Sequence, residues 1–179
     1  PSCPPRRSSD RPQGETAARF ATFSAMAPRI IDLSADFRLT DPVVYETWYG
    51  QPHPRPELLE RFVYGVPEIN RAALESATHV ACAGCNATAS MLALGPLARR
   101  DLISSVVIDV KAGSSEGGNS SNEASHHPER SGAVRSYRPT RHRHVAEVSQ
   151  ALGEFPSHFS APSTEMVRRT PDPKSLREG

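Results

Sequence analysis

The chain has 179 residues, with 21 Lys and Arg against 20 Asp and Glu, for a formal net charge of +1. That balance argues against a nucleic-acid partner, which calls for a clear basic excess. No apolar run is long enough to span a bilayer and no stretch is built like a secretory signal, so no membrane association is expected. Three cysteines are too few for a disulfide framework and favour a reducing, cytoplasmic location.

The hydrophobic residues, 37% of the chain, are unevenly distributed. Residues 1–28 contain no Leu, Ile or Val, and residues 168–179 contain a single Leu. Segments with so little to bury rarely become ordered. We therefore expect residues 1–28 to be disordered or non-native, residues 168–179 to be a disordered tail, and residues 29–167 to form the folded part.

The first half of the folded part predicts two strands and a helix. A short apolar run over residues 29–33, closed by small polar residues, is typical of a buried strand in an α/β sheet. Residues 45–64, rich in aromatic residues and proline, are expected to form a packed irregular connection. Helical spacing predicts a helix over residues 68–77, and a second strand follows over residues 78–83.

The second half continues the same alternation, which indicates an α/β fold. In chain order the sequence predicts a tight turn at 84–86, a buried helix over 87–100, a strand over 105–111, a polar loop over 112–132, a helix around 145–152 and a strand over 155–167. Gly95 and Pro96 imply a kink or a restart within the first of these helices. A loop as long as 112–132 is usually functional or disordered, and Gly117 and Gly118 permit close backbone approach to a ligand.

Cys85 stands where a predicted strand passes into a predicted helix, with Gly84 before it and Asn86 after it. In that position the backbone N–H groups and the positive helix end face the sulfur. They lower the pKa of a thiol and supply a nucleophilic thiolate near neutral pH. The same residues also fit a small buried cysteine at a turn.

His142 and His144 come just before the helix around 145–152. On an extended segment, residues i and i+2 point the same way, so both imidazoles can serve one site. Either ring is a candidate acid/base partner for a cysteine nucleophile. The alternative is a solvated basic turn.

Cys82 and Cys85 form a C-x-x-C pair that, together with His142 and His144, could supply the ligands of a zinc-binding module. No second C-x-x-C or matched histidine pair is spaced to complete such a site, and nothing fixes Glu147 as a further ligand. We therefore predict no metal site and keep the zinc module as an alternative.

Four segments carry a resemblance to a known family: IDLSADFR over 31–38, YGVPE over 64–68, AGCNATA over 83–89 and HRH over 142–144. In order and spacing they resemble the N-acetyl-γ-glutamyl-phosphate reductase family. Ala83 and Asn86 replace that family's usual proline and aromatic residue on either side of Gly-Cys, and Ser-Ser-Glu-Gly-Gly replaces its Ser-Gly-Ala-Gly loop. With these departures the chain resembles the branch acting on carrier-protein (LysW)-linked 2-aminoadipyl or glutamyl phosphate.

The resemblance implies an NADP-dependent oxidoreductase that reduces an acyl phosphate to a semialdehyde in lysine or arginine biosynthesis. Cys85 would form a thioester with the substrate, and His142 or His144 would transfer protons. The implied NADP-binding residues are Ser34, Ser114, Ser115, Gly117 and Gly118, and the implied substrate-binding residues are Arg38, Asn86 and Arg141.

The resemblance also implies partners and an architecture. The partners are a small acidic amino-group carrier protein, faced by Arg130, Arg135 and Arg143, and further copies of the chain. Residues 29–82 would be the C-terminal part of a Rossmann-like NADP-binding domain. Residues 83–167 would be part of a catalytic and dimerisation domain like that of glyceraldehyde-3-phosphate dehydrogenase. Because residues 1–28 lack the family's Gly-rich nucleotide turn and the family continues past residue 167, we expect the chain to be truncated or frameshifted at both ends.

Besides the zinc module, two alternatives stay open. One is N-acetyl-γ-glutamyl-phosphate reductase itself. The other is an inactive fragment of either enzyme that keeps only the dimerising surface.

Overall fold

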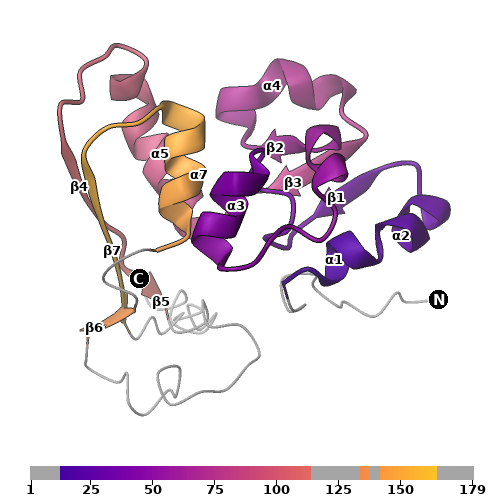
Figure 1. The fold of residues 1–179 in the computed structure, drawn as a ribbon. Helices are drawn as coiled ribbons and strands as arrows, with labels where there is room; N and C mark the ends of the chain where they lie inside the picture. Colours follow the sequence, from indigo (N-terminus) through magenta and orange to yellow (C-terminus); the bar gives the residue numbers. More distant parts are fainter. Residues whose placement is uncertain (1–12, 114–133, 138–141, 165–179) are drawn as a thin grey trace, which may run out of the picture.

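The computed structural model describes residues 13–113, 134–137 and 142–164. Within these residues the chain forms two sheets flanked by helices, and the first sheet ends shortly before Cys85 (Figure 1). The predicted α/β fold class is confirmed. None of the described helices has the length and apolar character needed to cross a bilayer.

The first sheet is parallel, with the strand order β1-β3-β2. Its strands are β1 (Ile30–Asp32), β2 (Val63–Gly65) and β3 (His79–Cys82). Ile31 lies opposite Val80, and Tyr64 lies opposite Ala81. Because the strands are parallel, their carboxyl ends share one edge of the sheet, and β3 leads from that edge to Cys85.

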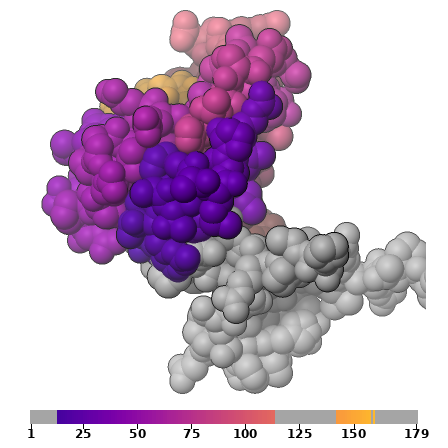
Figure 2. All heavy atoms as spheres, turned by 90° about the vertical axis from the view of Figure 1, so that its right-hand side faces the viewer, coloured from indigo at the N-terminus to yellow at the C-terminus, as the bar shows by residue number. Residues whose placement is uncertain are grey.

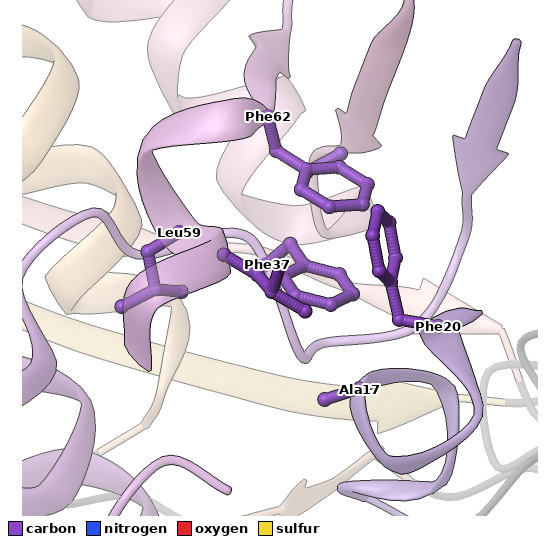
Figure 3. Close-up of a cluster of buried hydrophobic side chains, with 7 residues drawn as sticks. Ala17, Phe20, Phe37, Leu59 and Phe62 are labelled. Atoms are coloured by element: carbon purple, nitrogen blue, oxygen red, sulfur yellow. The ribbon is translucent and has the colours of Figure 1, made fainter. Parts of the chain in front are cut away.

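The helices of this unit are α1 (Glu15–Ala18), α2 (Phe20–Met26), α3 (Pro42–Tyr49), the 3-10 helix η2 (Pro56–Arg61) and α4 (Pro67–Ser76). Their core is aromatic (Figure 3): the rings of Phe37 and Phe62 stack with centroids 3.9 Å apart. Phe20 packs edge-on against both rings. This cluster fixes α2 and η2 to the sheet.

Residues 13–28 differ from the expectation of disorder. The backbone N–H groups of Gly14 and Ala17 donate to the buried Asp36 carboxylate at 2.7 and 3.0 Å, so α1 starts at a fixed point. Ala17 and Phe20 are buried in the aromatic core, and Figure 2 shows α1 and α2 packed against the rest of the unit. The segment contains no branched aliphatic residue, but one aromatic ring and one carboxylate contact order it.

The second sheet is built around β7 (Ser157–Thr164). The other strands are β4 (Val106–Asp109), β5 (Ala112–Gly113) and β6 (Val134–Tyr137). β4 and β5 pair with β7 in parallel, and β6 pairs with it antiparallel. The helices α5 (Cys85–Ala98) and α7 (His144–Leu152) pack on each other and lie between the two sheets (Figure 1).

A second apolar cluster joins the two units. Tyr64 and Val66, from the end of β2, pack with Ala87 and Met91 of α5 and with Val148 of α7. The site that begins at Cys85 is therefore held by both sheets.

Two predictions about the elements are wrong. Residues 45–64 are not an irregular connection throughout, because α3, η2 and β2 all include part of this range. The helix from Cys85 is not buried on all sides, since Leu92 and Leu97 are 45% and 46% exposed. Of the kink or restart expected at Gly95 and Pro96, the restart does not occur, because α5 runs unbroken from Cys85 to Ala98.

Candidate active site

Cys85 is the first residue of α5, three residues after the end of β3 at Cys82. The preceding residue, Gly84, is extended (φ −64°, ψ 147°), and no side chain caps the helix. The first-turn N–H groups of α5 therefore face the start of the helix, where the helix dipole is positive. Cys85 is exposed, and its thiol donates to Asn86 Oδ1 at 3.6 Å. This arrangement favours a reactive thiol over a buried one.

The second thiol of the motif has a different environment. Cys82 lies on β3 and is partly buried, and burial raises the pKa of its thiol. A raised pKa leaves less thiolate at neutral pH. Cys85 is therefore the better nucleophile of the pair.

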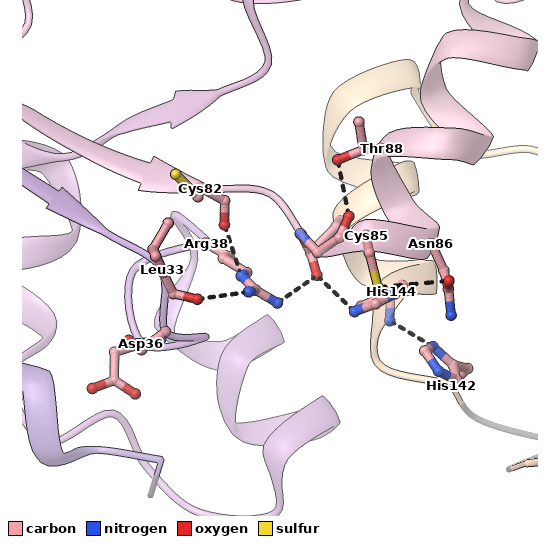
Figure 4. Close-up of polar contacts among 12 residues, drawn as sticks. Leu33, Asp36, Arg38, Cys82, Cys85, Asn86, Thr88, His142 and His144 are labelled. Carbon is pink, nitrogen blue, oxygen red and sulfur yellow. Dashed lines mark hydrogen bonds and ion pairs between the residues drawn. The ribbon is translucent and has the colours of Figure 1, made fainter. Parts of the chain in front are cut away.

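His142 and His144 lie together beside the start of α5 (Figure 4). Their rings meet edge-on, with centroids 4.6 Å apart. His142 is buried and stacks on Phe159 at 5.1 Å. The backbone N–H of His144 donates to His142 Nδ1 at 3.3 Å, so the proton of a neutral His142 is on Nε2.

His144 is wedged against the residue that precedes the cysteine. A Cβ atom on Gly84 would lie 2.3 Å from His144 Nε2, so only glycine leaves room for the ring. Burial, with the nearby Arg38 and Arg143, lowers the pKa of His144 to about 4. The imidazole is therefore neutral at physiological pH and able to accept a proton.

Glu147 stands at the centre of the site, although the sequence suggested it only as a metal ligand. Its side chain is fully buried. Oε2 accepts hydrogen bonds from the Tyr64 hydroxyl at 2.6 Å and from the Gly84 N–H at 2.8 Å. Oε1 lies 3.6 Å from Arg38 Nη1 and 3.7 Å from His144 Nε2. Burial and the Glu147 charge raise the pKa of Tyr64, so its hydroxyl stays a donor.

One sequence signal could have found Glu147. It follows His144 by three residues, a spacing that puts both side chains on one face of a helix. The Tyr64 and Gly84 contacts join distant segments, and no spacing rule reports them.

Arg38 and Ser34 lie where the strands of the first sheet end. Arg38 donates to the backbone carbonyls of Cys82 (2.9 Å) and Leu33 (3.1 Å), besides facing Glu147. The Ser34 hydroxyl donates to Asp32 Oδ2 at 2.7 Å and accepts from the Asp36 N–H at 3.1 Å. Both side chains thus have partners within the chain, and Arg38 ties the loop after β1 to the end of β3.

The remaining predicted site residues are not all described. Ser114, Ser115, Gly117, Gly118 and Arg141 lie outside the described residues. Asn86 is described and is buried beside the Cys85 thiol. In the described part of the chain, no three His, Cys, Asp or Glu side chains are grouped to hold a metal ion. The four residues of the zinc alternative are among those described, so that alternative has no support.

The carboxyl edge of the first sheet is where a nicotinamide cofactor would lie beside Cys85. In open α/β sheets such cofactors bind at the carboxyl edge of parallel strands, and Cys85 lies next to that edge. The sequence has no Gly-x-Gly-x-x-Gly turn, which usually holds the diphosphate.

Comparisons with known proteins found similar sequences. Residues 85–169 match the semialdehyde dehydrogenase dimerisation domain family. A LysW-L-2-aminoadipate 6-phosphate reductase of Deinococcus radiodurans is 51% identical over 164 residues, which cover 88% of this chain and 46% of the relative. A LysW-L-2-aminoadipate/LysW-L-glutamate phosphate reductase of Sulfurisphaera tokodaii is 51% identical over 129 residues, covering 71% of this chain and 37% of the relative.

The chain thus spans about half the length of the curated relatives it matches. A match to 88% of the chain must extend beyond residues 29–167. Some of the residues in 1–28 or 168–179, which the composition predicted to lie outside the folded part, are therefore also similar to the relatives. Among solved structures, an aspartate semialdehyde dehydrogenase II of Vibrio cholerae matches with a TM-score of 0.47 and 15% identity, covering 87% of this chain and 45% of that one.

Proposed function

Because the chain is a homologue of the LysW-L-2-aminoadipate phosphate reductases and carries a semialdehyde dehydrogenase dimerisation domain, we propose that it reduces an acyl phosphate through a thioester on Cys85. The substrate is 2-aminoadipyl or glutamyl phosphate linked to a small acidic carrier protein, and the product is the semialdehyde. One observation carries the proposal: an exposed cysteine begins α5 beside a neutral, largely buried imidazole.

In the first step the Cys85 thiolate attacks the carbonyl carbon of the acyl phosphate. A carbon–sulfur bond forms, the carbon–oxygen bond to phosphate breaks, and phosphate leaves with its electron pair. The thiol proton passes to His144 or to His142, both of which lie beside the start of α5. The first-turn N–H groups of α5 stabilise the negative charge on the attacked oxygen.

In the second step the thioester is reduced to the aldehyde, and NADPH, when bound, supplies the hydride. The histidine that took the thiol proton returns it as the product leaves. Ser34, the loop over 114–118, Asn86 and Arg141 remain candidates for binding cofactor and substrate. Since Arg38 is held by two carbonyls and Glu147, we assign it to positioning the site rather than to phosphate.

A matched pair of cysteine variants tests the proposal. Cys85→Ser removes the nucleophile and should lower kcat by about 1,000-fold or more, whereas Cys82→Ser should leave it within a few-fold of the wild type. The assay follows NADPH oxidation by the full chain with the carrier-linked acyl phosphate and, in parallel, the N-acetylglutamyl phosphate. Equal rates in both variants would refute the thioester. Faster turnover of the N-acetyl substrate would assign the chain to the neighbouring reductase.

A second candidate is an inactive protein that keeps only the dimerising surface, and the match of residues 85–169 to the semialdehyde dehydrogenase dimerisation domain family favours it. NADPH titration of the full chain separates the two functions, since failure to bind at millimolar cofactor supports the inactive protein. In both cases the dimerisation domain supports a homo-oligomer. The reduced thiol needed for catalysis is consistent with the cytoplasm.

A further inference from the structure

Glu147 is an unusual residue to find at 0% exposure. A buried carboxylate is costly unless charged and hydrogen-bonding groups surround it. Its partners come from four places in the chain: Tyr64 at β2, Gly84 before α5, Arg38 after β1 and His144 on α7. All four contacts converge on this one carboxylate, and one of them is made by the residue that immediately precedes the nucleophile.

The two oxygens of this carboxylate have different tasks. Oε2 accepts from Tyr64 and Gly84, which fixes the peptide immediately before Cys85. Oε1 faces Arg38 on one side and His144 Nε2 on the other, and it makes no hydrogen bond with a described residue. Since a carboxylate can only accept, the His144 nitrogen that faces it is the one that carries the proton.

The other nitrogen of this ring is then unprotonated. His144 Nδ1 is buried and has no hydrogen-bond partner among the described residues. With the ring proton on Nε2, Nδ1 keeps a lone pair that can accept a proton. The 3.7 Å from Nε2 to Oε1 is longer than a hydrogen bond, as resting sites often are before substrate binds.

We propose that Glu147 is a positioning residue that sets the tautomer of His144, with the proton on Nε2 and the basic lone pair on Nδ1. The consequence for catalysis rests on the proposed function. The tautomer itself is a property of the resting protein.

Glu147→Gln is the informative substitution. The amide oxygen is drawn to the Oε2 position, where the Tyr64 and Gly84 donors meet. The amide NH2 then takes the Oε1 position and faces His144. Because the amide NH2 is a donor, it favours an unprotonated Nε2 on the His144 ring that can accept its hydrogen. The proton of the neutral ring then moves to Nδ1. A correctly shaped site with the wrong tautomer loses most of its activity.

The first measurement is ¹⁵N NMR of the histidine-labelled full chain at pH 7, with the His144 signals assigned by their loss in His144→Gln. We expect the Nε2–H tautomer in the wild type and the Nδ1–H tautomer in Glu147→Gln. Glu154→Gln, the same change at an exposed position, should leave the wild-type tautomer. Nδ1–H in the wild type would overturn the proposal without any variant, and Nε2–H in Glu147→Gln would do the same.

The second measurement compares turnover in Glu147→Gln and Glu147→Asp. Gln keeps the shape and loses the charge, whereas Asp keeps the acceptor and shortens the side chain. A tautomer role predicts a loss of about 100-fold or more in kcat for Gln, a smaller loss for Asp, and little change in KM. Better tolerance of Gln than of Asp would indicate a merely structural role. Normal turnover in Cys85→Ser would refute the thioester alone, because the NMR result does not depend on turnover.

Discussion

Gly84 owes its identity to a neighbouring side chain rather than to its own backbone. Its φ and ψ of −64° and 147° are open to any residue, but a Cβ there would overlap His144. The glycine, the imidazole and the Cys85 that follows therefore depend on one another.

We expect Gly84→Ala to lower the free energy of unfolding by about 1–3 kcal/mol, because the added methyl must displace His144. In a double-mutant cycle, Gly84→Ala should cost much less in a His144→Ala background, where the methyl has room. Urea unfolding of the four proteins measures this coupling. Additive effects would show that the two residues do not meet.

The largely buried imidazole of His144 makes the stability of the protein depend on pH. The folded pKa of His144 is about 4, below the ordinary value of 6.5 in an unfolded chain. As the pH falls from 6.5 towards 4 the unfolded state takes up the proton first. The contribution of His144 to stability is therefore complete above pH 6.5 and lost as the pH falls through 4, by about 3 kcal/mol in all.

This prediction is tested by NMR titration of the His144 ring, with urea unfolding at pH 7 and pH 4.5. His144→Gln should lose less stability on acidification than the wild type. A His144 midpoint near 6.5 would contradict it.

At the scale of the elements, α3 shows a signal that sequence reading can miss. The segment is rich in aromatic residues and proline, which suggested an irregular connection. Yet Asp41 accepts from the Val43 N–H at 2.7 Å, and Pro42 occupies the first turn. Both are ordinary start signals for a helix.

Replacing this cap gives a clean test. Asp41→Ala should lower the free energy of unfolding by about 1 kcal/mol, while Asp41→Asn should cost little because its amide oxygen still accepts. Thermal or urea unfolding compares the two variants. An equal loss in both would show that charge rather than capping holds the start of α3.

Elements with a regular apolar period were predictable from the sequence. The strands β1, β3 and β4 and the helices α4 and α7 lie where the spacing placed them. The helices α1 and α2 were not predictable in this way. They are held in place by tertiary contacts, which are those of Phe20 in the aromatic core and of Asp36 with the start of α1.

The candidate site divides in the same way. Cys85 and the two histidines were found because their residue types carry chemistry and their spacing is local. Arg38 was predicted to be a site residue that binds substrate through its charge. Its hydrogen bonds to the carbonyls of Cys82 and Leu33 could not be predicted from the sequence. Glu147 acquires its role from Tyr64 and Gly84, which are 83 and 63 residues away in sequence.

Across the whole molecule, the two units are joined near the site by polar contacts as well as by the apolar cluster around Met91. Gln150 on α7 accepts from the Thr40 N–H at 2.8 Å and donates to the Arg38 carbonyl at 2.9 Å. These contacts link α7 to the loop that carries Arg38.

Gln150→Leu should release this loop without unfolding either sheet. We expect amide exchange at Thr40 to rise about five-fold, since one hydrogen bond is worth about 1 kcal/mol. Hydrogen exchange read by NMR gives the rate, and Gln51→Leu at an exposed position is the control. Unchanged protection at Thr40 would mean that the apolar cluster alone holds the loop.

The outer position of β1 has a practical consequence for anyone handling the chain. Among the described residues, β1 is an outer strand of its sheet, and Ile31 on it is 68% exposed. An outer strand with an exposed branched side chain invites pairing with another extended segment, which in concentrated solution leads to aggregates. Ile31 is not part of the buried core. Replacing it with a charged residue is therefore the substitution most suited to preventing aggregation of the protein.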